Sequence, residues 1–153
     1  MLIYKKMSIL DVPSDGILIH SCNLESKWDS GVALAIKNHI PKAFEDYQDM
    51  CPHNSLGTHD YFDYEQFGLV NLYVSKGDSQ HHDDPFSINF WTGIALMNFF
   101  KTCLDKENIY MPKINSGGFK VKWEDTEKLL TLLSETYNID ITICDLNMKE
   151  ENK

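Results

Sequence analysis

The sequence predicts an α/β fold with a largely parallel or mixed sheet. Short apolar runs that suit buried strands alternate with segments of helical period, and polar loops follow the strands. No internal repeat or linker divides the 153 residues, and a chain of this length can bury the core of one domain. We therefore expect a single domain over residues 1–146 and a charged tail over residues 147–153.

The clearest unit of the sequence runs from Gly16 to Tyr47. Residues 17–19 form a short run of Ile and Leu that ends at His20, which predicts a buried strand. A small, polar loop follows as far as Gly31, and apolar residues then recur at helical spacing until Pro41. This order places backbone N–H groups and a helix N-terminus at the carboxyl end of a strand, where α/β sheets bind anionic ligands.

The two-residue alternation of strands and the 3.6-residue period of helices predict the other elements. Strands are expected at 2–4, 69–74, 109–111 and 139–146, with 61–67 as an edge partner, and helices at 87–104 and 123–137; the segments 52–57 and 75–85 are expected to be surface loops. A second polar, glycine-bearing loop covers residues 115–119, so that Ile109–Tyr137 repeats the order strand, loop, helix. We expect both loops to open on one cleft.

The composition limits the classes of partner. The net charge is −9 and no basic cluster is longer than Lys5-Lys6, which argues against general binding to nucleic acid. A small phosphate-bearing ligand stays possible, because backbone N–H groups can hold it. The four cysteines lie far apart, and the sequence has no signal peptide and no apolar run of membrane length. We expect a cytoplasmic protein without membrane association; the sequence identifies no protein partner.

Several side chains have both a functional and a structural interpretation. His20 at its strand end could be a general acid or base or a partner of ribose hydroxyls, or it could be a buried, hydrogen-bonded structural histidine. Asn23 could bind the hydroxyls of a sugar or hold a turn. Cys22 is expected to pack as a small apolar side chain.

The two polar loops also allow two interpretations. They could hold a phosphate or diphosphate from both sides through backbone N–H groups, or they could be ordinary turns that need glycine for positive φ. The run His81-His82-Asp83-Asp84 has the residue types of a metal site but no regular ligand spacing, so we expect it to be solvated surface. We expect no metal and no cofactor. Glu124 and Asp125 are expected to be first-turn acids of a helix.

Two separated motifs give the sequence a family resemblance. The segment I-L-I-H-S-C-N, followed by W-x-x-G-[IV]-A and P-K-A-x-x-x-Y, resembles the macro domain family, and within it the ADP-ribose 1″-phosphate phosphatases. The segment M-P-K-I-N-S-G-G-F-x-V-x-W-E is similar to the M-P-x-I-N-S-G…W segment of the same subfamily. The resemblance runs from about Ile9 to Leu146 and is weakest between Pro52 and Ser87. It implies a three-layer α/β/α macro domain with a central mixed sheet and a cleft for an ADP-ribose-type nucleotide.

The resemblance also implies an activity and a set of site residues. The activity is hydrolysis of ADP-ribose 1″-phosphate to ADP-ribose and phosphate, with water as nucleophile and no metal. His20 and Asn23 are the implied catalytic residues, facing the distal ribose and its phosphate, and His20 would protonate or orient groups around the phosphoester. The implied ligand-binding residues are Ser8, Ile9, Cys22, Trp28, Asp29, Ser30, Gly31, Val32, Asn115, Ser116, Gly117, Gly118 and Phe119.

This sequence departs from the pattern of the family at several positions. Met7 and Ser8 replace the family's Gly and its acidic or amide residue near the adenine. The glycine-rich first loop of the family carries Ser26, Asp29 and Ser30 here, and Ala33 stands where mono-ADP-ribosyl hydrolases keep a catalytic aspartate.

These departures leave two hypotheses, a phosphatase and a non-catalytic module that binds or sequesters ADP-ribose or a related nucleotide. Side chains of Asp29 and Ser30 that point out of the cleft favour the phosphatase, whereas side chains that fill the phosphate site favour the binding module. Lys120 and Lys122 either offset the charge of Asp29 or face solvent.

Overall fold

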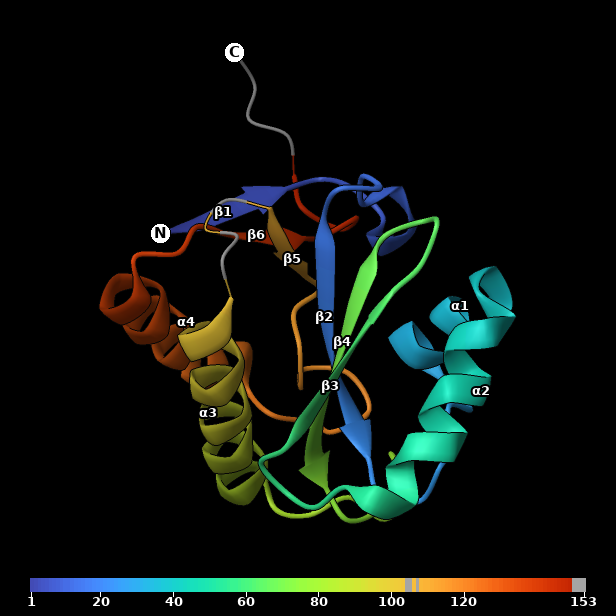
Figure 1. Ribbon diagram of the computed structural model, residues 1–153. Coiled ribbons are helices and arrows are strands. Elements are labelled where there is room, and N and C mark those ends of the chain that lie inside the picture. The colour runs from blue at the N-terminus through green and yellow to red at the C-terminus, as the bar shows by residue number, and fades with distance from the viewer. Residues whose placement is uncertain (104–105, 107, 150–153) are drawn as a thin grey trace.

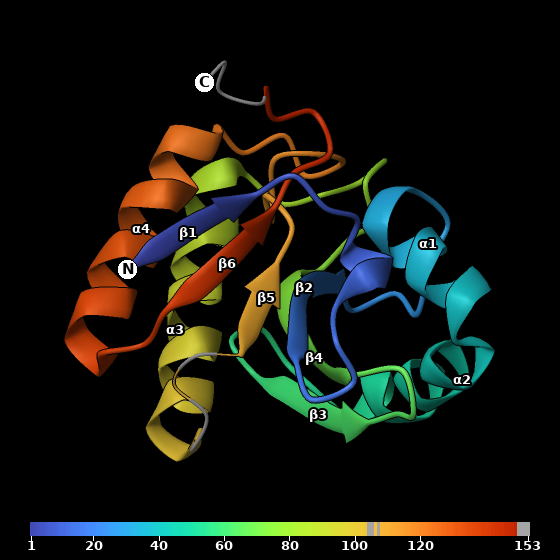
Figure 2. The same cartoon turned by 90° about the horizontal axis from the view of Figure 1, so that it is seen from above.

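Six strands form one mixed sheet in this computed structural model, which describes residues 1–103, 106 and 108–149. The strands are β1 (Leu2–Lys5), β2 (Ile17–Asn23), β3 (His59–Asp63), β4 (Gly68–Ser75), β5 (Ile109–Met111) and β6 (Ile141–Cys144). Their order across the sheet is β1-β6-β5-β2-β4-β3, which the view from above makes visible (Figure 2). All neighbours are parallel except β3 and β4, which are antiparallel.

Helices cover both faces of this sheet. They are α1 (Gly31–His39), α2 (Pro41–Met50), α3 (Pro85–Thr102) and α4 (Trp123–Tyr137), with short 3-10 turns at Ile9–Asp11 and Cys51–His53. Helices α3 and α4 lie on one face and α1 and α2 on the other, so that the molecule has three layers (Figure 1). Each interface between a helical layer and the sheet has its own apolar core. The predicted α/β class and the three-layer α/β/α arrangement are confirmed.

The observed boundaries differ from the predicted ones for local reasons. The helix expected before Pro41 is followed at once by α2, because proline is well tolerated at the first position of a helix. Helix α3 begins at Pro85 rather than residue 87, since the Asp84 side chain accepts a hydrogen bond from the Ser87 N–H group and caps it. The predicted end of this helix at residue 104 lies outside the described residues.

The last strand is shorter than the predicted range 139–146. Asn138 ends α4 in the left-handed conformation, with φ of 52°. The Ile139 N–H group then donates to the Ser134 carbonyl, so residue 139 still belongs to the helix terminus and β6 begins at Ile141. Of the predicted charged tail, residues 147–149 are described and residues 150–153 lie outside the described part of the chain.

Strand β2 places the polar residues that follow its apolar run at the carboxyl edge of the sheet. It pairs in parallel with β4 on one side and with β5 on the other, and its register with β4 shifts between Cys22 and Asn23. Because β2, β4, β5 and β6 run in the same direction, the loops after them gather at one edge. The fold therefore brings the first polar loop beside the loop that follows β5.

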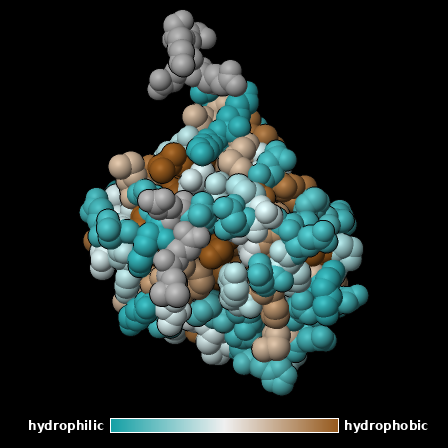
Figure 3. Space-filling model, turned by 45° about the horizontal axis from the view of Figure 1, so that its top comes forward, coloured by the Kyte–Doolittle hydropathy of each residue, from teal (hydrophilic) through white to brown (hydrophobic). Residues whose placement is uncertain are grey.

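The surface of the molecule is mainly polar on the face seen in Figure 3, where hydrophobic residues lie in small groups between hydrophilic ones. In the described part of the chain, none of the helices combines the length and the apolar character that crossing a bilayer requires.

Candidate ligand-binding cleft

One cleft of about 630 Å³ opens at the carboxyl edge of the sheet. Every site residue expected from the sequence lines it: Ser8, Ile9, His20, Cys22, Asn23, Trp28, Asp29, Ser30, Gly31, Val32, Asn115, Ser116, Gly117, Gly118 and Phe119. The prediction that both loops open on one cleft is confirmed. The volume is within the usual range for a small-molecule site.

The N-terminus of α1 forms one wall of the cleft. Gly31 has φ of 58°, a conformation that glycine adopts without strain, and an added Cβ there would meet no atom within 4 Å. The side chain of the N-cap residue Ser30 makes no capping hydrogen bond, and the first turn of α1 holds no acidic residue. The first backbone N–H groups of α1 and the positive end of its dipole are therefore available to an anion in the cleft.

The second loop forms the opposite wall and is held by polar contacts of Asn115. This residue has φ of 68°, its Oδ1 accepts a hydrogen bond from Ser21 Oγ at 2.7 Å, and its Nδ2 donates to Thr92 Oγ1 at 3.0 Å. Strand β2 and helix α3 thus fix the loop through one buried amide. An added Cβ on Gly117 would meet no atom within 4 Å, so this part of the loop leaves room for a ligand.

His20 lies below the first loop, with 1% of its surface exposed. Its Nε2 is 2.7 Å from Asn71 Oδ1, and because that oxygen only accepts hydrogen bonds, Nε2 carries the proton. Nδ1 is buried and has no hydrogen-bond partner among the described residues. Burial lowers the pKa of His20 to about 4, against a smaller opposing effect of the Asn71 hydrogen bond. The imidazole is therefore neutral near pH 7.

Trp28 packs between His20 and helix α2. Its ring stacks on Tyr47 with 4.6 Å between ring centroids and meets the His20 ring edge-on at 5.0 Å. Only 1% of the Trp28 surface is exposed. The indole therefore anchors the first loop onto the helical layer and packs against one side of the His20 ring.

Asn23 is hydrogen-bonded within the chain on both sides of its amide. Nδ2 donates to the Lys27 carbonyl at 2.8 Å, and Oδ1 accepts from Tyr47 Oη at 2.8 Å and from the Glu25 N–H group at 2.9 Å. Asn23 therefore holds a turn, as one of its two interpretations predicts, because its side chain bonds to the backbone of residues 25 and 27. Asn23 also lines the cleft, where its role toward a ligand stays a prediction.

We expect Asn23→Ala to loosen the first loop while leaving the fold intact. A buried amide with three partners loses its hydrogen bonds, so the free energy of unfolding should fall by about 1–3 kcal/mol. Urea denaturation measures this change. Asn38→Ala, at an exposed asparagine of α1, is the control and should change stability little. An Asn23→Ala protein of unchanged stability would contradict this positioning role.

Asp29 and Ser30 stand at the mouth of the cleft, and both side chains are exposed. Ser30 Oγ lies 3.4 Å from Ser79 Oγ, across the opening. The nearby Lys27 has an ammonium group 3.1 Å from Glu25 Oε2, and this contact raises the pKa of Lys27, with a smaller contribution from Asp29. The Asp29 carboxylate thus borders the cleft without filling its floor, and a lysine lies near it.

The basic residues at the cleft are not those considered from the sequence. Lys120 and Lys122 are exposed and do not line it, so they face solvent. Lys27 and Lys113 line it instead, and Lys113 Nζ is 3.1 Å from Asp145 Oδ2. Residues 144–147, after the last strand, also line the cleft. The sequence does not predict this, because no local pattern indicates that the segment after β6 lies beside the first polar loop.

The histidine- and aspartate-rich run divides among separate structural roles. Asp84 caps α3, Asp83 accepts a hydrogen bond from the Lys76 N–H group, and His82 Nδ1 contacts the Asp83 carbonyl. His81 Nδ1 is 3.1 Å from Asp78 Oδ1. The four residues therefore do not form one site.

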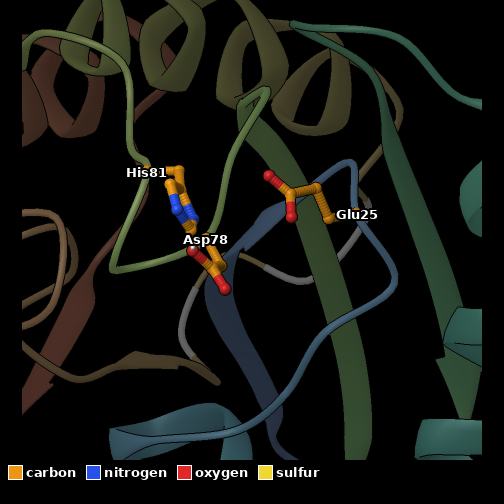
Figure 4. A group of neighbouring side chains, drawn as sticks. All are labelled: Glu25, Asp78 and His81. Carbon is orange, nitrogen blue, oxygen red and sulfur yellow. Dashed lines mark hydrogen bonds and ion pairs between the residues drawn. The ribbon is translucent and has the colours of Figure 1, made fainter.

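His81 instead lies near two acidic residues from other positions, as Figure 4 shows. The possible ligand atoms of Glu25, Asp78 and His81 all lie within 4.8 Å of one another. The Lys27 ammonium group contacts both carboxylates, at 3.1 Å from Glu25 and 3.8 Å from Asp78. This single positive charge offsets half of the negative charge of the two carboxylates.

Ser8, at the position expected near the adenine, is hydrogen-bonded to the backbone of the turn that follows it. Its Oγ accepts a hydrogen bond from the Leu10 N–H group at 3.1 Å and begins the short turn Ile9–Asp11. The side chain still lines the cleft beside Met7 and Ile9. Met7 and Ile9 therefore add apolar side chains to the lining beside Ser8.

Comparison with known proteins gives curated relatives named ADP-ribose 1″-phosphate phosphatase. No family model matches the chain. The ADP-ribose 1″-phosphate phosphatase of Candida albicans is 32% identical over 74% of this chain and 79% of that protein. The protein of the same name from Saccharomyces cerevisiae strain YJM789 is 32% identical over 83% of this chain and 89% of that protein.

Solved structures share the fold at lower sequence identity. The macrodomain of Mycobacterium tuberculosis DarG superposes with a TM-score of 0.77 at 19% identity and covers 94% of this chain and 97% of that chain. Thermosipho africanus DarTG in complex with ADP-ribose gives a TM-score of 0.71 at 15% identity and covers 90% of this chain and 40% of that chain. Fold, cleft and relatives agree, and the chain belongs to the ADP-ribose 1″-phosphate phosphatase family of macro domain proteins.

Proposed function

We propose that this protein hydrolyses ADP-ribose 1″-phosphate to ADP-ribose and inorganic phosphate. The observation that carries the proposal is the uncapped N-terminus of α1, which faces the 115–119 loop across one cleft. Two relatives named for this activity are 32% identical to the chain over most of both lengths. The product, ADP-ribose, is also the ligand named for the Thermosipho africanus structure of the same fold.

Backbone N–H groups bind the phosphates of the ligand. The first N–H groups of α1 and those of the glycine-bearing loop donate hydrogen bonds, and the helix dipole favours negative charge. The lysines that line the cleft are paired with carboxylates, Lys27 with Glu25 and Lys113 with Asp145. Electrostatic stabilisation of the reacting phosphate therefore comes mainly from oriented N–H groups rather than from a free ammonium.

His20 acts as a hydrogen-bond acceptor in the reaction. Since its Nε2–H group donates to Asn71 and the ring is neutral, Nδ1 can accept a proton or a hydrogen bond but has none to give. We assign it to the attacking water or to a ribose hydroxyl beside it, with water adding across the phosphoester bond. Asn23 acts as a positioning residue, because its hydrogen bonds fix the first loop beside His20.

Ligand binding and turnover need separate measurements, because a binding module of the same fold is the competing hypothesis. Calorimetry with ADP-ribose tests the cleft, and release of inorganic phosphate from ADP-ribose 1″-phosphate tests the reaction. We expect both to be positive. Binding without phosphate release would establish the binding module, and absence of both would remove adenine nucleotides from consideration.

Replacing Asp29 with Asn should strengthen binding of the product ADP-ribose, which is not turned over, by less than about fivefold. An exposed carboxylate repels the phosphates by roughly 1 kcal/mol or less, and Lys27 offsets part of this. Calorimetry at low salt measures the gain, which should disappear near 0.5 M salt. Asp15→Asn, an exposed change that does not line the cleft, is the matched control. Weaker binding by Asp29→Asn would mean that Asp29 itself holds the ligand.

The cysteines support a reducing compartment for this activity. Cys22, Cys51 and Cys144 are buried and form no disulfide. We place the protein in the cytoplasm on this ground.

A further inference from the structure

The loop that joins β4 to α3, residues 76–84, contributes two residues to the cleft. Asp78 and Ser79 line it, although neither is among the site residues expected from the sequence. Ser79 Oγ lies 3.4 Å from Ser30 Oγ at the start of α1, and its Cβ would lie 2.6 Å from a Cβ added to Gly118. Ser79 therefore lies between the N-terminus of α1 and the second polar loop, so close to the latter that only glycine fits beside it.

The position of Ser79 is fixed by the turn that contains it. The Asp78 carboxylate accepts a hydrogen bond from the Gln80 N–H group at 3.0 Å and lies 3.1 Å from His81 Nδ1 on the same loop (Figure 4). The other carboxylate oxygen of Asp78 is 3.8 Å from the Lys27 ammonium group, which connects the turn to the first polar loop. A turn held in this way presents the Ser79 hydroxyl with little loss of conformational freedom on binding.

The hydroxyl of Ser79 is available to a stronger acceptor than Ser30. Hydrogen bonds between a hydroxyl and an oxygen are usually about 2.7–2.8 Å long, so the 3.4 Å contact between the two serines is weak. Two hydroxyls at this separation can both donate to one oxygen at normal length. A phosphate oxygen suits this position, because hydrogen bonds to charged acceptors are stronger than hydrogen bonds between neutral groups.

The strand order shows which end of the cleft Ser79 borders. Residues 144–147 follow β6 and residues 78–79 follow β4, and these strands are separated in the sheet by β5 and β2. With neighbouring strands ~4.8 Å apart, the two ends of the cleft are about 14 Å apart. Met7 and Ile9, which follow β1, add apolar side chains at the β6 end that suit a base. A nucleotide bound along the cleft with its base there brings its terminal phosphate toward the β4 end, beside Ser79.

Electrostatic attraction alone does not favour a phosphate at this end of the cleft. The carboxylates of Glu25, Asp29 and Asp78 stand near the Lys27 ammonium group, so the sum of these charges is negative. A preference for a phosphorylated ligand therefore has to come from oriented donors. Serine hydroxyls are such donors, since they carry no charge and rotate toward the acceptor.

We propose that Ser79 gives this site its preference for the 1″-phosphorylated nucleotide over ADP-ribose, by donating a hydrogen bond, together with Ser30, to the terminal phosphate. This inference rests on the proposed function, because it takes ADP-ribose 1″-phosphate as the ligand. ADP-ribose has a hydroxyl in place of this phosphate, so it gains no charge-assisted hydrogen bond from Ser79. Ser79 is thus a specificity residue and takes no part in proton transfer.

Calorimetry with the two nucleotides measures this preference without relying on turnover. The measurement uses the His20→Gln background, where slow hydrolysis leaves the phosphorylated ligand intact. We expect Ser79→Ala to weaken binding of ADP-ribose 1″-phosphate about tenfold and binding of ADP-ribose less than about twofold. Alanine keeps the Cβ beside Gly118, so only the hydroxyl is removed. Ser14→Ala, the same change at an exposed serine outside the cleft, is the matched control and should alter neither affinity.

Phosphate-release kinetics provide a second readout in the chain that retains His20. Ser79→Ala should lower kcat/KM about tenfold, with most of the loss in KM, because the terminal phosphate is held in the substrate and in the transition state alike. Circular dichroism and binding of ADP-ribose verify that the variant is folded.

An unchanged ratio of the two dissociation constants in Ser79→Ala would overturn the inference. An equal loss for both nucleotides would overturn it as well, because Ser79 would then only hold the walls of the cleft together. Either result leaves the proposed reaction standing if the unchanged chain releases phosphate. Conversely, a ratio that depends on Ser79 in a chain that releases no phosphate would support the inference and contradict the proposed reaction.

Discussion

We expect His20→Ala to lower the rate of phosphate release from ADP-ribose 1″-phosphate by about 10²–10⁴-fold, the range of a positioned acid or base. Nδ1 of His20 is the buried acceptor beside the cleft that has no partner among the described residues, and its Nε2–H group is fixed by Asn71. Removing the ring therefore removes a positioned acceptor. The turnover number should carry most of the loss, while the affinity for ADP-ribose changes little.

The interpretation needs a variant that preserves the packing around Trp28, because a buried alanine also leaves a cavity. His20→Gln keeps most of the volume and should lose turnover to a similar extent. His53→Ala, at an exposed histidine, should behave as the unchanged chain. Phosphate release within about twofold of normal by a folded His20→Gln protein would remove His20 from the mechanism and leave it a structural residue.

Asn71 should act through His20 in the same reaction. It is fully buried in β4, opposite His20 in the parallel register, and holds the ring in one tautomer. Asn71→Asp keeps the acceptor oxygen and should retain more turnover than Asn71→Leu, which frees Nε2. Equal turnover by the two variants would show that the tautomer of His20 is unimportant. Phosphate-release kinetics of the two folded proteins make the comparison.

The sequence predicts the fold and the cleft largely because both depend on local patterns. The apolar run before His20 and the helical spacing after Gly31 are features of neighbouring residues, and they predict the β2–loop–α1 unit correctly. The loop at 115–119 follows the same rule after β5. Because parallel strands end at one edge of a sheet, these two local predictions together place both loops on one cleft.

The parts of the site that the sequence does not predict come from long-range contacts. Asn71 is a polar residue inside an apolar strand, and only its pairing beside β2 makes it a partner of His20. Residues 144–147 reach the cleft because β6 lies next to β5 in the sheet. Lys27 is different, because it is only two residues from Glu25 and from Asp29 in the sequence, and its one long-range contact is with Asp78.

The buried state of His20 also predicts a large dependence of stability on pH. Its pKa is about 4 in the folded protein and near 6.5 in an exposed chain. Between these values the unfolded state binds more protons than the folded state, so the free energy of unfolding falls as the pH decreases. The contribution is fully present above pH 6.5 and reaches a loss of about 3 kcal/mol below pH 4.

Urea denaturation at pH 7.0 and pH 4.5 measures this loss when His20→Gln is compared with the unchanged chain. Gln does not titrate, so the variant should lose roughly 2–3 kcal/mol less stability between the two pH values. The half-buried His59, whose pKa burial also lowers, is present in both proteins and cancels in the difference. Equal losses in both proteins would mean that His20 titrates normally in the folded state, and the neutral, hydrogen-bond-accepting imidazole of the proposed mechanism would lose its basis below pH 6.5. A smaller loss of stability in His20→Gln would instead show that burial against Trp28 keeps the His20 imidazole neutral in the folded protein.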